Sequence, residues 1–219
     1  MANKTLQTNT NQSFTRKMGR GILIATSIIF VCLLILVGTL LILSPGKSTP
    51  IVGEDGNPLP GSISEKVFVN INGLEQGMFI KSKDPKNPVL LFLHGGPGMT
   101  EYFLTQRYPT GLENDFTVIW WDERGAGLSY SPNIPPETMT IEQLVSDTLE
   151  VTNYLRHRFG KEKIYLMGHS GGSFIGIQAA KQAPELYHAY IGMGQMTYQL
   201  DSEKLAYDYM LEQYKQNEN

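Results

Sequence analysis

The chain of 219 residues has little cysteine and no surplus of positive charge. Its single cysteine, Cys32, lies in an apolar run near the N-terminus, so the remainder holds neither a disulfide framework nor a cysteine-based metal site. The 18 lysines and arginines are outnumbered by 21 aspartates and glutamates, and the two signs are interspersed. The formal net charge of -3 therefore leaves no basic face for nucleic acid, and no nucleic-acid partner is expected.

Charged side chains are missing altogether from residues 21–43, a run of 23 residues. As a helix this run would span about 34 Å, enough to cross a hydrocarbon core of about 30 Å. Four basic residues stand before it, Lys4, Arg16, Lys17 and Arg20, whereas the nearest charges after it are Lys47, Glu54 and Asp55. The positive-inside bias predicts a cytoplasmic N-terminus and a single membrane pass, with the rest of the chain outside. A cleaved signal peptide is the alternative, but its apolar region is usually about 7–15 residues long, which favours an uncleaved signal anchor.

Composition divides the chain into five segments. Residues 1–20 form a cytoplasmic tail, and the first 18 are polar, rich in Asn, Gln and Thr, and expected to be disordered. Residues 21–43 are the predicted anchor, and residues 44–64 contain eight glycines and prolines and are interpreted as a linker. A globular core is expected at 65–200, and residues 201–219 are expected to begin a further helix.

The core shows two strand-like runs around Asn72-Gly73, a strong hairpin signal, and then apolar runs separated by segments of helical spacing. Strands are expected at 66–70, 76–81, 89–93, 116–121, 163–167 and 187–193, and helices at 140–159, 173–182 and 202–215. In the helix at 140–159, the spacing puts Asp147 and Glu150 on the side opposite the apolar residues. Two antiparallel strands followed by strands that alternate with helices predict an α/β fold with a mostly parallel sheet flanked by helices. In such sheets ligands bind at the carboxyl ends of the strands.

The strand at 163–167 leads into Gly168-His169-Ser170-Gly171-Gly172, after which a helix is expected. This is the G-x-S-x-G nucleophile elbow in its strand–turn–helix setting. Glycines are needed because the serine has a strained backbone at a sharp turn, where neighbouring side chains would collide. The turn presents the hydroxyl at the N-terminus of a helix, whose dipole favours developing negative charge. The motif predicts Ser170 as the catalytic nucleophile.

The strand at 89–93 leads into His94-Gly95-Gly96-Pro97-Gly98. Glycines here let a backbone N–H approach a substrate carbonyl oxygen, as an oxyanion hole requires. The N–H groups of Gly171 and Gly96 are the predicted donors, with Gly95 as the alternative to Gly96. His94 precedes the turn and is interpreted as a buried brace of the loop rather than a base.

A third motif, Asp122-Glu123-Arg124-Gly125-Ala126-Gly127-Leu128-Ser129, follows the run at 116–121. The G-x-G-x-x-G spacing of a phosphate cradle is missing. We interpret the segment as a structural turn in which Asp122 and Arg124 tie neighbouring loops together, with a substrate-lining role as the alternative.

The motifs HGGPG, WDERGAGLS and GHSGG, in this order, resemble the proline iminopeptidase branch of the α/β-hydrolase fold, the serine aminopeptidases. The resemblance covers about residues 65–195. It implies Ser170 as nucleophile, Gly96 and Gly171 at the oxyanion hole, and hydrolysis of a small peptide, amide or ester without metal or cofactor. Family members commonly carry a tryptophan directly after the nucleophile, where this chain has Gly171. That departure predicts a roomier acyl pocket and argues against strict proline selectivity.

A serine nucleophile needs a base, and in this fold the acid and then the histidine follow the serine. Only His188 follows Ser170, and it stands at the start of a strand; Asp201 is a weak candidate for the acid. The family fold has about eight strands and a helical cap, against six expected strands here. We therefore expect the N-terminal part of a longer enzyme, inactive as 219 residues alone. An esterase or lipase of the same fold, or a catalytically inactive anchored binding protein, is the alternative.

Overall fold

The computed structural model describes residues 2–43 and 47–217. The remaining positions, which include residues 44–46 of the predicted linker and residues 218–219 of the predicted terminal segment, lie outside the described residues. The chain divides into two compact units, residues 1–46 and 47–219, and each is described by itself.

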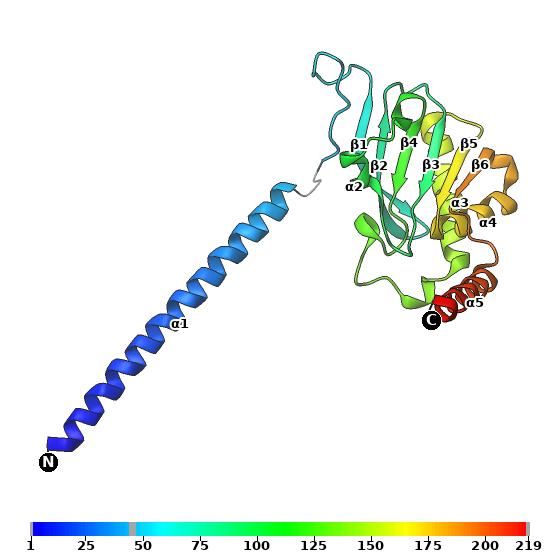
Figure 1. The fold of residues 1–219 in the computed structure, drawn as a ribbon. Helices are drawn as coiled ribbons and strands as arrows, with labels where there is room; N and C mark the ends of the chain where they lie inside the picture. Colours follow the sequence, from blue (N-terminus) through cyan, green and yellow to red (C-terminus); the bar gives the residue numbers. More distant parts are fainter. Residues whose placement is uncertain (1, 44–46, 218–219) are drawn as a thin grey trace. The chain divides into compact units, whose positions relative to one another are not determined.

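The first unit is one helix, α1 (Ala2–Leu43), shown in blue in Figure 1. Its stretch Met18–Ile42 has a mean hydropathy of 2.8 and is long and apolar enough to cross a membrane, a criterion that an N-terminal signal sequence also meets. Hydroxyl groups within it are satisfied locally: Ser27 Oγ donates to Leu23 O at 2.8 Å. The expectation of disorder before this stretch is wrong, because the helix begins at Ala2. Extending an existing helix costs far less than starting a new one, so the apolar run carries the polar segment with it.

The second unit is built on one six-stranded sheet. Its strands are β1 (Ile63–Ile71), β2 (Leu74–Ser82), β3 (Val89–Leu93), β4 (Thr117–Trp121), β5 (Ile164–His169) and β6 (Tyr187–Met193), in the order β1-β2-β4-β3-β5-β6. β1 and β2 are antiparallel, as are β2 and β4, whereas β4, β3, β5 and β6 run parallel to one another (Figure 1). The predicted α/β architecture with a mostly parallel sheet is confirmed.

The hairpin between β1 and β2 turns at Asn72 and Gly73, as the sequence predicts. Both residues have positive φ, 46° and 80°, which matches the type of turn whose twist fits a two-residue hairpin. The tight turn pairs Ile71 with Leu74 and fixes the register along both strands.

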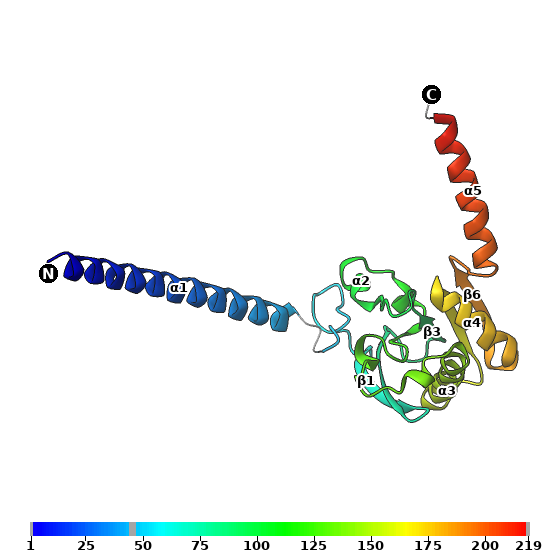
Figure 2. The same cartoon turned by 90° about the horizontal axis from the view of Figure 1, so that it is seen from below.

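Helices cover both faces of the sheet. α3 (Ile141–Phe159) and α4 (Gly171–Gln182) pack on one face, and the short α2 (Tyr102–Arg107) packs on the other (Figure 2). α3 begins where the Thr140 side chain accepts a hydrogen bond from the Gln143 N–H at 3.2 Å, and it ends at the left-handed Gly160.

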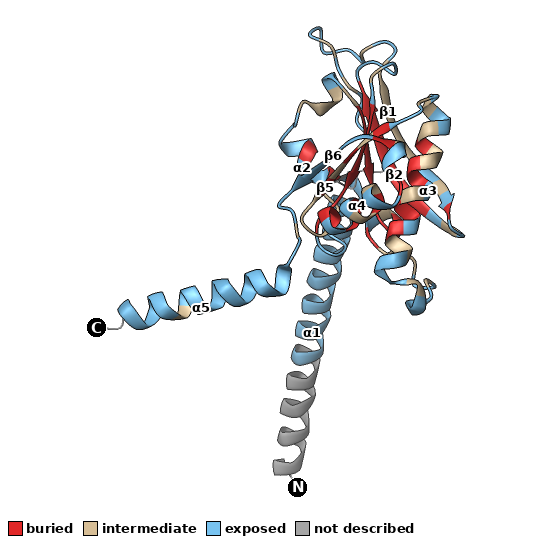
Figure 3. Cartoon of the chain, turned by 90° about the vertical axis from the view of Figure 1, so that its right-hand side faces the viewer, coloured by how far each residue is buried: buried red, intermediate tan, exposed pale blue. Residues whose placement is uncertain are grey.

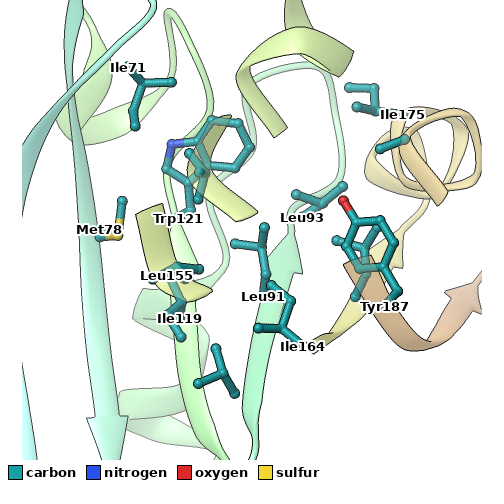
Figure 4. Packing of buried hydrophobic residues seen from close by; sticks show 14 of the residues in the cluster. Ile71, Met78, Leu91, Leu93, Ile119, Trp121, Leu155, Ile164, Ile175 and Tyr187 are labelled. Carbon is teal, nitrogen blue, oxygen red and sulfur yellow. The ribbon is translucent and has the colours of Figure 1, made fainter. Parts of the chain in front are cut away.

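The two cores explain why β3 is apolar at every position and β4 is apolar after Thr117, whose hydroxyl donates to Ser82 Oγ at 3.0 Å. Successive side chains of a strand point to opposite faces, so a central strand covered on both sides needs apolar residues throughout. Leu91 and Trp121 contribute to the larger core, below α3 and α4 (Figure 4). Leu90 and Trp120 contribute to the smaller one, where the Tyr102 ring of α2 stacks on Phe79 with 3.8 Å between ring centroids.

The two ends of this unit differ in how they are attached. The described part of the predicted linker, residues 47–64, is hydrogen-bonded to the rest of the unit: Thr49 Oγ1 donates to Gln106 Oε1 of α2 at 2.8 Å. At the other end, α5 (Gln199–Asn217) has no buried residue among those described, and most of β6 is exposed (Figure 3).

Candidate active site

The three sequence motifs follow β3, β4 and β5, and these strands are neighbours in the sheet. Leu93, the last residue of β3, pairs with both Trp121 of β4 and Gly168 of β5. The carboxyl ends of parallel strands meet at one edge of a sheet, so the three motif loops come together there. The sequence predicted that the three motifs lie at this edge, and in the structure their loops are in contact.

Ser170 occupies the turn between β5 and α4 with φ 50° and ψ -117°. Among the described residues other than glycine, only Asn72 shares a positive φ. Such a conformation costs on the order of 1–3 kcal/mol and persists only where its surroundings enforce it. Here the Ser170 N–H donates to Met193 O at 2.8 Å, and Ser173 Oγ donates to Ser170 O at 2.5 Å. The backbone of the elbow is thus fixed from β6 and from the first turn of α4.

The flanking glycines of the elbow are sites of very close backbone contact. A Cβ added to Gly168 would lie 2.6 Å from Gly172 O. A Cβ added to Gly172 would lie 2.5 Å from both Leu93 O and His94 O. The missing side chains therefore allow α4 to start directly against the end of β3. This is the steric reason for the glycines of the motif.

A Gly172→Ala variant is expected to lose about 3 kcal/mol or more of unfolding free energy, because rigid backbone oxygens meet the new methyl group. Urea unfolding followed by tryptophan fluorescence measures the loss. Gly176→Ala is the matched control on the same helix, since its Cβ meets the Tyr190 ring at 2.8 Å and a side chain can shift. Equal stability of the two variants would contradict the proposed steric role of Gly172.

The loop after β3 lies directly against the elbow. Gly96 has φ 121°, and a Cβ on it would lie 2.6 Å from Gly98 N, so only glycine fits. The Gly96 carbonyl oxygen lies 2.6 Å from the position of a Cβ on Gly171, so no side chain can start at residue 171 with the loop in this position. The acyl pocket was expected to be roomier because residue 171 has no side chain. The space next to the Gly171 Cα is instead occupied by the Gly96 peptide.

The structure distinguishes between the N–H groups considered for the oxyanion hole. The Gly95 N–H donates to Glu101 Oε1 at 2.9 Å, so the alternative donor is already engaged. Pro97 has no N–H, and the Met99 N–H donates to Gly95 O at 3.1 Å. Within the described structure the Gly96 N–H has no such partner, and its pairing with the Gly171 N–H stays a prediction.

His94 is buried, with 2% of its surface exposed, and it braces two loops. Its Nε2 accepts the Glu123 N–H at 3.1 Å, which leaves Nδ1 to carry the proton and donate to Gly95 O at 2.8 Å. Burial lowers the pKa of His94, so the ring is neutral at pH 7. The interpretation of His94 as a brace is confirmed.

Glu101 is a further residue of this region, and no motif pointed to it. Its Oε1 accepts the Gly95 N–H and lies 2.7 Å from His169 Nδ1, so one carboxylate joins the loop after β3 to the elbow. Glu101 stands in the N-cap position of α2, a helix of six residues that the sequence pattern did not predict. The contact can be recognised only in three dimensions, since the two partners lie 68 residues apart along the chain.

The remaining histidines lie away from Ser170. His157 is exposed on α3, and His188 is exposed on β6, where its ring centroid lies 5.1 Å from that of Tyr165. Asp201 is exposed on α5. In residues 47–217, none of the histidines forms a hydrogen bond with the Ser170 hydroxyl.

The segment after β4 is secured by two separate carboxylates. Asp122 Oδ2 accepts the Leu128 N–H at 2.8 Å within its own loop, and burial raises the pKa of Asp122 to about 6. Arg124 forms two hydrogen bonds with Asp147 of α3, at 2.7 and 3.1 Å. The helical pattern placed Asp147 on the solvent side, and this is wrong: the residue is fully buried because Arg124 supplies its counter-charge. Arg124 therefore ties the turn to a helix.

No group of three or more His, Cys, Asp or Glu side chains that could hold a metal ion is found in the described part of the chain.

The chain is similar in sequence to proteins of known families. The family described as alpha/beta hydrolase fold matches residues 88–218. The probable aminopeptidase YbaC of Bacillus subtilis (strain 168) is 41% identical over 155 residues, which are 71% of this chain and 49% of that protein. The proline iminopeptidase of Clostridium botulinum is 33% identical over 107 residues, 48% of this chain and 34% of that protein. The chain thus spans about half the length of the first relative and about a third of the second.

Solved structures show the same likeness. A proline iminopeptidase-related protein from Thermus thermophilus is 28% identical with a TM-score of 0.51, over 59% of this chain and 44% of that one. A 2-hydroxy-6-oxo-6-phenylhexa-2,4-dienoate hydrolase from a Rhodococcus species is 26% identical with a TM-score of 0.52, over 62% of this chain and 47% of that one.

Proposed function

Because the chain belongs to the alpha/beta hydrolase fold family, we propose that it is a serine hydrolase of aminopeptidase type that forms an acyl-enzyme on Ser170. The observation that carries the proposal is the strained backbone of Ser170 at the junction of β5 and α4, the position and conformation that a nucleophile elbow requires. The names of relatives, probable aminopeptidase and proline iminopeptidase, support a small peptide or amide as the substrate class.

In the proposed reaction the Ser170 oxygen attacks the substrate carbonyl carbon, and the carbonyl oxygen becomes negatively charged. The N–H groups of Gly96 and Gly171 donate to this oxygen, and the N-terminus of α4 favours the charge. The intermediate collapses to an ester on Ser170 as the C–N bond breaks, and the leaving amine takes up the proton that the serine hydroxyl has lost. Water then hydrolyses the ester and restores the serine hydroxyl.

The serine proton needs an acceptor, and none of the described histidines forms a hydrogen bond with the Ser170 hydroxyl. We propose that the 219 residues by themselves turn over slowly for this reason. In serine hydrolases the loss of a triad member typically lowers the rate by about 10⁴-fold or more. A stoichiometric probe is therefore a better test of the nucleophile than a turnover assay.

We further propose that α1 anchors the hydrolase unit in a membrane by a single pass. Residues 1–20 would lie in the cytoplasm, residues 44–64 would form a linker, and the hydrolase unit, residues 65–200 with the terminal segment 201–219, would lie outside. The length and hydropathy of Met18–Ile42 and the basic residues before it support this orientation.

A fluorophosphonate probe tests the proposed nucleophile, because it phosphonylates activated serines without requiring turnover. We expect the probe to attach to Ser170, as identified by mass spectrometry of the digested chain, and at a rate that rises with pH. Attachment to a different serine would overturn the assignment. No attachment even at high pH, where hydroxide replaces the missing base, would favour a catalytically inactive binding protein. Parallel assays with leucine and proline anilides and with acyl esters separate the aminopeptidase from the esterase or lipase alternative. A clear preference for esters would make the esterase or lipase the better supported function.

A further inference from the structure

In the described structure, the side chain of Glu123 is a buried carboxyl without a hydrogen-bond partner. Only 6% of the residue is exposed, and Oε1 is enclosed and receives no hydrogen bond within the described structure. The neighbouring cation, Arg124, is committed to Asp147. Burying a carboxyl without a hydrogen bond is costly, and such groups in a folded protein call for a functional or structural reason. The backbone gives none, because the Glu123 N–H is fixed by His94 and the side chain is not needed to hold the turn.

Glu123 lines a cavity of about 200 Å³ that also reaches the elbow. The backbones of Gly96 and Gly171, which carry the proposed oxyanion donors, form one part of its wall. Apolar side chains, including Leu144 of α3 and Phe174 of α4, form another part. Glu123 is the acidic residue of this lining, so the cavity combines an apolar interior with one unsatisfied carboxyl beside the site of chemistry.

We propose that this cavity binds the N-terminal residue of the substrate, with the Glu123 carboxyl bonded to its free amino group. The inference rests on the proposed function and deepens it. In an aminopeptidase substrate the amino group is attached to the carbon next to the scissile carbonyl. A carbonyl oxygen held between the N–H groups of Gly96 and Gly171 therefore directs that amino group into the space that Glu123 lines. An acyl group without an amine would leave the carboxyl as unsatisfied as it is in the free chain.

The protonation states of the two groups are matched. Burial, with the nearby Asp122 carboxyl, raises the pKa of Glu123 to about 8. The α-amino group of a peptide has a pKa of about 7.7–8.0. The two groups can thus share one proton and enter the apolar cavity as a pair without net charge. The other titratable groups near Glu123 are His94, which is neutral, and Asp122, whose own pKa is raised to about 6.

Two ligands that differ only in the amine test the proposal on the full chain in detergent micelles. Leucinamide carries the amino group, and 4-methylpentanamide is the same molecule without it. Binding is followed by ¹³C NMR of the chain labelled at glutamate side-chain carboxyl carbons, with the Glu123 signal assigned by its loss in E123Q. We expect leucinamide to bind at least about tenfold more tightly than 4-methylpentanamide, as hydrogen bonds to charged groups allow. We also expect it to lower the apparent pKa of Glu123, because an ammonium partner favours the carboxylate.

In E123Q the two ligands should bind equally well. Equal affinity in the unmodified chain, no binding of leucinamide, or an amine preference that survives in E123Q would overturn the proposal. If E123Q fails to fold, E123M removes the acceptor at similar side-chain length and takes its place in the comparison. The measurement does not depend on the nucleophile, so Ser170→Ala should keep the amine preference. A failed binding test and a failed serine assignment are thereby distinguishable.

Discussion

A Ser170→Ala variant is expected to take up no fluorophosphonate while it remains as stable as the unmodified chain. The label is carried on the serine oxygen, so its removal eliminates the product rather than slowing its formation. Stability should be preserved because the Ser170 side chain forms no hydrogen bond in the described structure, and only its backbone N–H and carbonyl are engaged. Alanine faces the same strained backbone as serine, so the strain is unchanged.

In-gel fluorescence after probe treatment measures the labelling, and urea unfolding measures the stability. Ser202→Ala, an exposed serine on α5, is the control and should label normally. Unchanged labelling of Ser170→Ala would show that another serine reacts, and the elbow would then be structural only. Loss of labelling together with a change in unfolding free energy larger than about 0.5 kcal/mol would indicate a folding effect instead.

The sheet could be predicted because the sequences of its central strands are diagnostic by themselves. Val89–Leu93 is apolar at every position and Thr117–Trp121 at every position after its first, which is the mark of strands covered on both faces. Asn72-Gly73 fixed the hairpin through backbone conformation alone. The elbow at Ser170 could be predicted because the motif itself contains the glycines, of which Gly168 is required by a contact within the turn, with Gly172 O.

Features that depend on contacts between distant segments could not be predicted. α2 has six residues, too few to show a helical period, and its Glu101 cap residue is tied to Gly95 and His169 only by the fold. The burial of Glu123 likewise could not be predicted from its segment, in which three charged residues are followed by Gly-Ala-Gly. Asp147 was placed on the wrong face of α3 because periodicity treats every carboxylate as solvent-seeking, and only the position of Arg124 reverses that preference.

An Asp147→Ala variant is expected to lose about 3–5 kcal/mol of unfolding free energy. Asp147 is fully buried and accepts hydrogen bonds from Arg124, from Gln76 at 2.9 Å, from Asn72 at 2.8 Å and from Gln143 at 2.8 Å. Its removal leaves the Arg124 guanidinium buried without a counter-charge, and this penalty dominates the loss. The effect should extend to the sheet, because Gln76 also accepts the Trp121 Nε1–H at 3.0 Å.

Urea unfolding followed by tryptophan fluorescence measures this loss, and Glu150→Ala is the matched control, an exposed carboxylate one turn further along α3. The control should stay within about 0.5 kcal/mol of the unmodified chain. A paired Arg124→Met and Asp147→Leu replacement should recover most of the stability, since buried ion pairs replaced together by apolar residues are often close to neutral. If Asp147→Ala is no less stable than Glu150→Ala, the network does not hold the turn after β4. The position of Glu123 beside the elbow would then need another explanation, because that turn is what carries it there.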